Sequence, residues 1–294
     1  MNLSPPRERA DRLQRSHPPL AFTYAVIKKF GEDSSGNLAV LITYYAFFSI
    51  FPLLLVLFSV VGFLLGEHPD WQRKIEDGAL SQFRHLPLIN HPLPQHGSVT
   101  VIVIGTVLAL YSGLGVAKTA MKVWDTVYGV APEDRPGTID TNLLALRLVV
   151  VGGLGLVATT ILAGTVASGA AIGLDISWAL SFASYAVSFV LNTLLFSVIF
   201  RWLTVREVTF KQALPGAVLF ALSLVVLQVL VPAWISHQLA RSEAEYGEAG
   251  AVLVLLGWFY VQAQLLVLSA QINVVKQDHL WPRSLVDNEP AAAG

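Results

Sequence analysis

The sequence of 294 residues contains no cysteine and few charged residues. Without cysteine, disulfides, thiolate metal sites and cysteine nucleophiles are excluded. Asp, Glu, Lys and Arg make up 13% of the chain, against roughly 25% in ordinary soluble domains. The net charge of −1 gives no general attraction for nucleic acid, so we expect no nucleic-acid partner. The hydrophobic share is 54% and the mean hydropathy is +0.60, which indicates a polytopic membrane protein.

Recognisable catalytic motifs are also missing. The chain has no nucleotide-binding glycine loop, no HExxH and no G-x-S-x-G. Four of the seven histidines fall between residues 66 and 97, but their spacing does not form a compact metal motif, so we predict no metal site. No charged residue lies deep in an apolar segment, and a proton relay therefore lacks its usual carriers. We expect a protein that is not an enzyme and has no cofactor.

Long uncharged runs dominate what the sequence does contain. The first extends from Leu38 to Leu65, longer than the ~20 apolar residues that a bilayer requires. The six segments of this kind are Leu38–Leu65, Ser98–Ala117, Leu148–Leu174, Ser177–Phe200, Gln212–Trp234 and Ala249–Val275. We predict an all-α bundle of six transmembrane helices over residues 21–277, between disordered cytoplasmic tails at residues 1–20 and 278–294.

Two short amphipathic stretches accompany the spans. Phe22, Val26 and Phe30 precede the first span, and they predict an interfacial helix. The outer loop, residues 66–97, has apolar residues at every fourth position. That pattern fits either a helix lying on the membrane surface or a helix packed over the ends of the spans.

Lysine and arginine are distributed unevenly between the two sides. Of 19 such residues, 15 lie on the side that carries both termini and four lie on the other. The positive-inside rule therefore predicts cytoplasmic termini, which requires an even number of spans.

Polar residues follow one face of three predicted spans. They are Tyr44, Tyr45, Ser49 and Pro52 in the first span, Tyr185, Ser188 and Asn192 in the fourth, and Tyr260, Gln264 and Gln271 in the sixth. Polar groups inside a bilayer are costly and need a partner or a water-filled cavity. Such stripes can join neighbouring helices through hydrogen bonds of roughly 0.6–2 kcal/mol each. They can also converge on a hydrated pocket between the helices, which is the function we predict for these residues.

Pro52 interrupts the helix of the first span. It removes one backbone hydrogen bond and frees the carbonyl of Phe48. Ser49 is close enough to help satisfy the broken turn. The resulting kink either lets a long helix pack or opens a polar cavity lined by Tyr44 and Tyr45.

Two arginines stand near the predicted cytoplasmic ends of spans, Arg147 in the third and Arg201 in the fourth. They can hold phosphate headgroups. The alternative is that they are ordinary cytoplasmic anchors.

Three ordered blocks of sequence resemble a known family. They are NLAVLITYYAFFSIFPLLLVL, AMKVWDTVYGV, and LPGAV through EYGEAGAVLVLLGWFYVQAQLLVLSAQINVV. Over residues 20–277 the chain resembles the YihY/BrkB family of bacterial inner-membrane proteins, once mislabelled ribonuclease BN. The resemblance implies a multi-pass protein of the inner membrane that handles membrane lipids. A transporter or lipid-translocation protein for envelope maintenance is one reading, and a non-transporting scaffold that binds other envelope proteins is the alternative. The oligomeric state stays open.

The chain departs from the family pattern in the last span. The family commonly has G-A-E-[IL] where this chain has Ser269-Ala270-Gln271-Ile272. Gln271 can hydrogen-bond a substrate or a neighbouring helix, but it cannot titrate.

Overall fold

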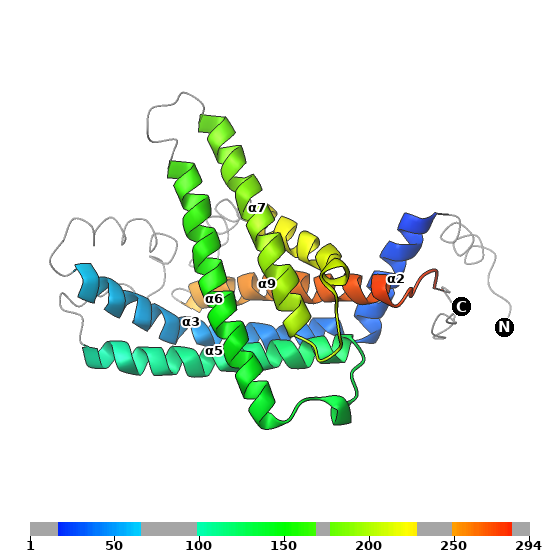
Figure 1. Cartoon of the computed structure of the whole chain (residues 1–294), viewed down its shortest axis with the longest axis horizontal. Helices are drawn as coiled ribbons and strands as arrows, with labels where there is room; N and C mark the ends of the chain where they lie inside the picture. The colour runs from blue at the N-terminus through cyan, green and yellow to red at the C-terminus, as the bar shows by residue number, and fades with distance from the viewer. Residues whose placement is uncertain (1–16, 66–98, 169–176, 228–248, 284–294) are drawn as a thin grey trace. The chain divides into compact units, whose positions relative to one another are not determined.

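The computed structural model describes residues 17–65, 99–168, 177–227 and 249–283 (Figure 1). In chain order the elements are α2 (Pro18–Glu32), α3 (Ser35–Leu65), α5 (Val99–Val127), a 3-10 turn (Pro132–Asp134), α6 (Thr138–Ser168), α7 (Ser177–Trp202), helix Phe210–Leu227 and α9 (Ala249–Gln277). These described ranges contain no strand. The predicted all-α fold is confirmed.

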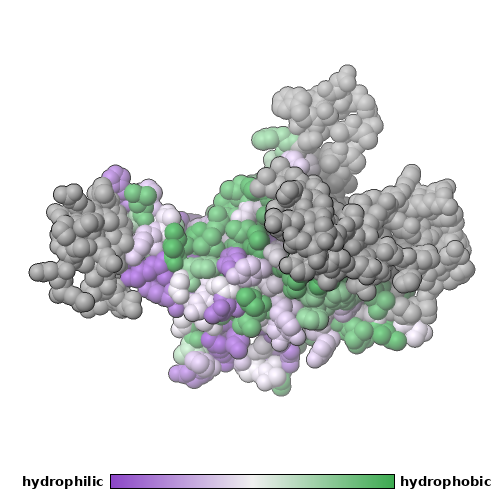
Figure 2. Space-filling view, turned by 180° about the vertical axis from the view of Figure 1, so that it is seen from behind, coloured by the Kyte–Doolittle hydropathy of each residue, from purple (hydrophilic) through white to green (hydrophobic). Residues whose placement is uncertain are grey.

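Among the described residues, six helices are long and apolar enough to cross a membrane. Helix α3 is one of the longest, with 31 residues. Its length of about 46 Å exceeds the ~30 Å of a hydrocarbon core. Large apolar side chains such as Val107, Leu154 and Phe182 are exposed on these helices, and Figure 2 shows broad hydrophobic patches on the described surface. Such a surface is stable against lipid, in agreement with the six predicted spans.

Some helix ends differ from the prediction. Helix α5 continues to Val127 instead of ending near Ala117, and α6 begins at Thr138 instead of Leu148. The added turns are polar, so hydropathy misses them although the helix continues. Helix α2 already begins at Pro18. The outer loop 66–97, including its predicted amphipathic helix, and most of the two predicted tails lie outside the described residues.

The chain divides into two compact units. Unit 1 comprises Met1–Ala39, Ala120–Val226 and Ala263–Gly294, and unit 2 comprises Val40–Thr119 and Leu227–Gln262. Helices α3, α5 and α9 contribute residues to both.

In unit 2, α3 and α5 pack as an antiparallel pair through glycines. A Cβ on Gly105 would lie 3.2 Å from Val56, and one on Gly115 would lie 3.1 Å from the ring of Tyr45. The small residues on α5 therefore let the side chains of α3 approach closely.

In unit 1, α6 and α7 form a second antiparallel pair (Figure 1). Gly152 faces Ile199, with 3.6 Å between its ideal Cβ position and the Ile199 side chain, and Gly155 faces Leu195. The third and fourth spans are therefore antiparallel neighbours.

Aromatic side chains form the core of unit 1 near the C-terminal end of α7. Phe200 lies 5.1 Å from Trp124 of α5, and Phe196 lies 4.6 Å from Phe220 of helix Phe210–Leu227, between ring centroids. Trp124 and Phe200 are fully buried. This cluster ties three helices together at one level.

Helix α2 packs its apolar face on the end of α9. Ala25, Val26 and Val275 form a buried cluster, and Phe22 meets Trp281 edge to face at 5.2 Å between centroids. The predicted amphipathic helix before the first span is therefore present, and its apolar side faces protein.

Helix α5 ends at a glycine that the turn requires. Gly129 has φ +68°, and the N–H groups of Gly129 and Val130 donate to the carbonyls of Thr126 and Asp125. This is the Schellman arrangement, in which a left-handed residue closes the last turn.

Candidate functional site

A buried polar pair lies within α7. The Nδ2 of Asn192 donates to the Oγ of Ser188 at 3.1 Å, and each residue is 5% exposed. The helix ends at Trp202, a residue type that favours the membrane interface. The chain rises about 15 Å between Asn192 and Trp202, half the thickness of a hydrocarbon core of ~30 Å. The pair therefore lies near the middle of the span.

The rest of the predicted stripe on α7 does not share this burial. Tyr185 is 40% exposed. Thus the structure brings together Ser188 and Asn192 and places Tyr185 at the surface of the helix.

On α3, the predicted residues belong to unit 2. The rings of Tyr44 and Tyr45 contact edge to face at 5.5 Å between centroids, and the Tyr45 ring also packs on Gly115. Pro52 lies inside the helix. Ser49 donates to the carbonyl of Ala46 at 2.8 Å, so its hydroxyl serves that turn instead of the Phe48 carbonyl freed by Pro52.

The predicted stripe on α9 divides between the units. Tyr260 belongs to unit 2 and is partly exposed, whereas Gln264 and Gln271 belong to unit 1. The convergence of the three stripes on one pocket stays a prediction.

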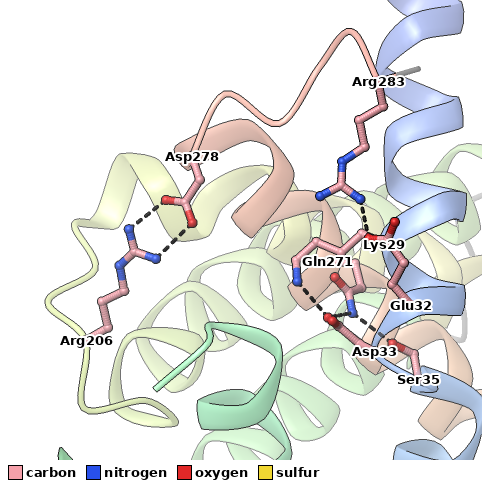
Figure 3. A network of polar contacts seen from close by, with 8 residues as sticks. All are labelled: Lys29, Glu32, Asp33, Ser35, Arg206, Gln271, Asp278 and Arg283. Atoms are coloured by element: carbon pink, nitrogen blue, oxygen red, sulfur yellow. Dashed lines mark hydrogen bonds and ion pairs between the residues drawn. The ribbon is translucent and has the colours of Figure 1, made fainter. Parts of the chain in front are cut away.

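Gln271 joins three helices in unit 1 (Figure 3). It is fully buried, and its Nε2 donates to Asp33 Oδ2 at 2.7 Å and to Ser35 Oγ at 2.8 Å. Lys29 also binds Asp33 Oδ2, at 2.7 Å. Asp33 follows the last residue of α2 and Ser35 begins α3. The amide of Gln271 therefore fixes the junction of α2 and α3 on α9.

Two further ion pairs extend this polar network (Figure 3). Arg206 binds Asp278 through two parallel bonds of 2.6 and 2.9 Å, and this pairing raises the pKa of Arg206. Arg283 binds Glu32. Asp278 and Arg283 lie in the segment predicted to be a disordered tail, and both bind side chains of the helical region. Sequence reasoning missed these pairs because their members are far apart in the chain.

Asp125 holds the end of α5 to the segment after α7. It is buried, and its Oδ1 accepts from the hydroxyl of Thr204 at 2.9 Å and from the N–H of Val205 at 3.1 Å. A single aspartate eight residues beyond the end of the predicted span gives no sequence signal for such a bond.

Asn273 joins α9 to helix Phe210–Leu227. Its Oδ1 accepts from the N–H of Gly216 at 2.7 Å, and its Nδ2 donates to the carbonyl of Ala213 at 3.2 Å. Pro215, next to Gly216, has no N–H to offer its own helix. The side chain of Asn273 thus supports a weakened turn.

Tyr128 lies beside this contact, just beyond the end of α5. Burial raises the pKa of Tyr128 to about 12, and the nearby Asn273 amide partly offsets that shift. The phenol is therefore neutral throughout the physiological range.

The two predicted headgroup arginines lie at the α6–α7 pair. The guanidinium of Arg147 stands over the ring of Trp202, 3.7 Å from its centroid. Arg201 is exposed, and its Nε donates to the carbonyl of Val208 at 2.9 Å.

These groups suit hydrogen bonding more than bond-breaking chemistry. The described residues contain no group of three His, Asp or Glu side chains that could hold a metal ion. Amides, hydroxyls and paired charges dominate instead. Six long apolar helices among the described residues, with buried polar contacts between some of them, define a polytopic helical membrane protein.

Comparison with known proteins gives the family. The family model for the virulence factor BrkB matches residues 26–293. The chain therefore belongs to the BrkB family, as the sequence blocks predicted.

Two curated relatives agree. The chain is 28% identical to the inner membrane protein YhjD of Escherichia coli strain K12 over 288 residues, 89% of this chain and 82% of that protein. It is 23% identical to a ribonuclease-like protein, YfkH, of Bacillus subtilis strain 168 over 255 residues, 83% and 90% of the two chains. No solved structure matches the chain. With its six apolar helices, the chain is a multi-pass inner membrane protein.

Proposed function

We propose that this protein moves a membrane lipid, or another amphipathic solute, across the inner membrane in support of the envelope, and that it is not an enzyme. The observation that carries the proposal is the buried Ser188–Asn192 pair. An amide near the middle of a span is costly and Leu would be less so, which favours a functional reason for Asn192.

The hydrogen-bonding capacity of Asn192 supports this reading. A side-chain amide offers two donors and an acceptor with two lone pairs. Within the described part of the chain, the Asn192 amide makes one hydrogen bond, to Ser188. It therefore has capacity left for a polar group that passes at mid-depth, the level at which transporters place their substrate sites.

Flip of a fluorescent phospholipid in reconstituted vesicles tests the proposal. We expect the full chain to speed flip over that of empty vesicles, and Asn192→Leu to slow it. Ser197→Ala is the matched control. Its hydroxyl is also buried in α7, but it donates only to the carbonyl of Thr193 in its own helix. Equal rates in protein-containing and empty vesicles would remove lipid transport and favour the scaffold.

A further inference from the structure

Arg147 of α6 lies on Trp202 of α7, and Arg201 is the neighbour of Trp202 in the chain. We propose that this cationic cluster of Arg147 and Arg201 binds the headgroup of an anionic phospholipid. The packing of Gly152 against Ile199 brings Arg147 level with the end of α7. There its guanidinium lies 3.7 Å from the centre of the Trp202 ring. Such a contact fixes the direction of a flexible side chain.

No carboxylate of the described residues neutralises the charges of the cluster. Both arginines are exposed. In the ranges that the structure describes, neither Arg147 nor Arg201 forms an ion pair, whereas Arg206 and Arg283 each bind a carboxylate. Guanidinium groups bind phosphate through paired hydrogen bonds and give up their hydration readily. Two guanidinium groups that are not paired with a carboxylate favour an anionic headgroup over a zwitterionic one.

The surroundings supply a place for the acyl chains. Leu146, Val150 and Leu154 are exposed on one face of α6; Leu146 precedes Arg147, and Val150 and Leu154 follow it by one and two turns. Trp202 marks the level of the membrane interface. A phospholipid with its phosphate at the arginines can therefore lay its chains along this apolar face. A free phosphate ion would leave that face unused.

This inference goes beyond the proposed transport, because a bound lipid of this kind requires no movement across the membrane. Its test is a binding measurement, so it succeeds or fails independently of any flip assay. Native mass spectrometry of the full chain in detergent can count bound dioleoyl-phosphatidylglycerol and dioleoyl-phosphatidylcholine.

We expect wild type to prefer phosphatidylglycerol, and Arg147→Gln or Arg201→Gln to weaken that binding about fivefold, the effect of one cation near an anionic surface. Arg201→Gln leaves the Arg147–Trp202 contact in place, so it gives a reading even if Arg147→Gln folds poorly. Arg147→Lys should restore part of the loss. Lys122→Gln, which removes another exposed cation of unit 1, should bind as wild type does.

Three results would overturn the proposal. They are equal binding of the two lipids by wild type, an equal loss in Lys122→Gln and Arg147→Gln, and complete displacement of phosphatidylglycerol by inorganic phosphate. The last would identify a site for the free ion.

Discussion

Gln271 is the residue on which the junction of α2, α3 and α9 depends. Both protons of its amide are used, one by Asp33 and one by Ser35. Gln271→Glu replaces a donor by a carboxylate next to the carboxylate of Asp33. We expect a loss of about 2–4 kcal/mol at neutral pH, because a buried charge then lacks its partner. The loss should shrink as the pH falls, since a shared proton relieves the repulsion.

Thermal unfolding of the variant in detergent, followed by circular dichroism between pH 5 and 8, measures this effect. The double variant Asp33→Asn/Gln271→Glu restores one amide beside one carboxylate and should recover part of the loss. A single variant as stable as wild type at pH 8 would show that the amide contacts contribute nothing.

Tyr128 gives a prediction on the alkaline side. Its pKa in the folded protein is about 12, raised by burial from 10.0. A raised pKa means that the stability from the neutral phenol is complete below pH 10 and is lost as the pH rises toward 12. The difference in absorbance at 295 nm between wild type and Tyr128→Phe should titrate near 12. A difference that titrates near 10 in folded protein would contradict the burial of this phenol.

At the scale of helices, Gly216 decides how closely helix Phe210–Leu227 approaches α9. A Cβ there would overlap the carbonyl oxygen of Ser269 and lie 2.6 Å from Nδ2 of Asn273. Gly216→Ala should therefore cost about 2–4 kcal/mol, from backbone displacement and the loss of the Asn273 bonds.

Gly153→Ala provides the control for this prediction. A Cβ on Gly153 meets nothing within 4 Å. Because alanine favours the helix more than glycine does, Gly153→Ala should leave the protein as stable as wild type or up to about 1 kcal/mol more stable. The melting temperatures of the two variants in the same detergent give the comparison. Equal melting temperatures would mean that the two helices can separate without cost.

The helices themselves were largely predictable, because lipid imposes a simple rule on composition. All six spans follow from uncharged runs. Their ends were harder to predict. Helix α5 continues through polar turns, where Trp124 packs on Phe200, and it ends at Val127 before the turn at Gly129.

The candidate site was predictable only in part. Helical spacing identified Ser188 and Asn192 correctly as neighbours. It did not reveal that Gln271 binds Asp33, or that Arg206 binds Asp278, because these contacts join residues brought together by tertiary packing. Tyr185 shares the spacing of the stripe but not its burial.

For the whole molecule, the distribution of lysine and arginine predicts that both termini are cytoplasmic. The absence of native cysteine makes labelling of introduced thiols unambiguous. Glu133 is exposed in the 3-10 turn between α5 and α6. In Glu133→Cys, a membrane-impermeant maleimide should react in inside-out vesicles and not in right-side-out ones. The reverse pattern would invert the topology.

The central claim is that Asn192 belongs to a path that water and substrate can reach. The most direct measurement is the rate at which a water-soluble maleimide labels Asn192→Cys in membranes, compared with Leu194→Cys on the exposed, lipid-facing side of α7 and with Glu133→Cys. Thiols react as thiolates and therefore need water. We predict that Asn192→Cys is labelled well above Leu194→Cys. Labelling of Glu133→Cys alone, with both α7 positions inert, would contradict the account and make the Ser188–Asn192 pair a joint between packed helices.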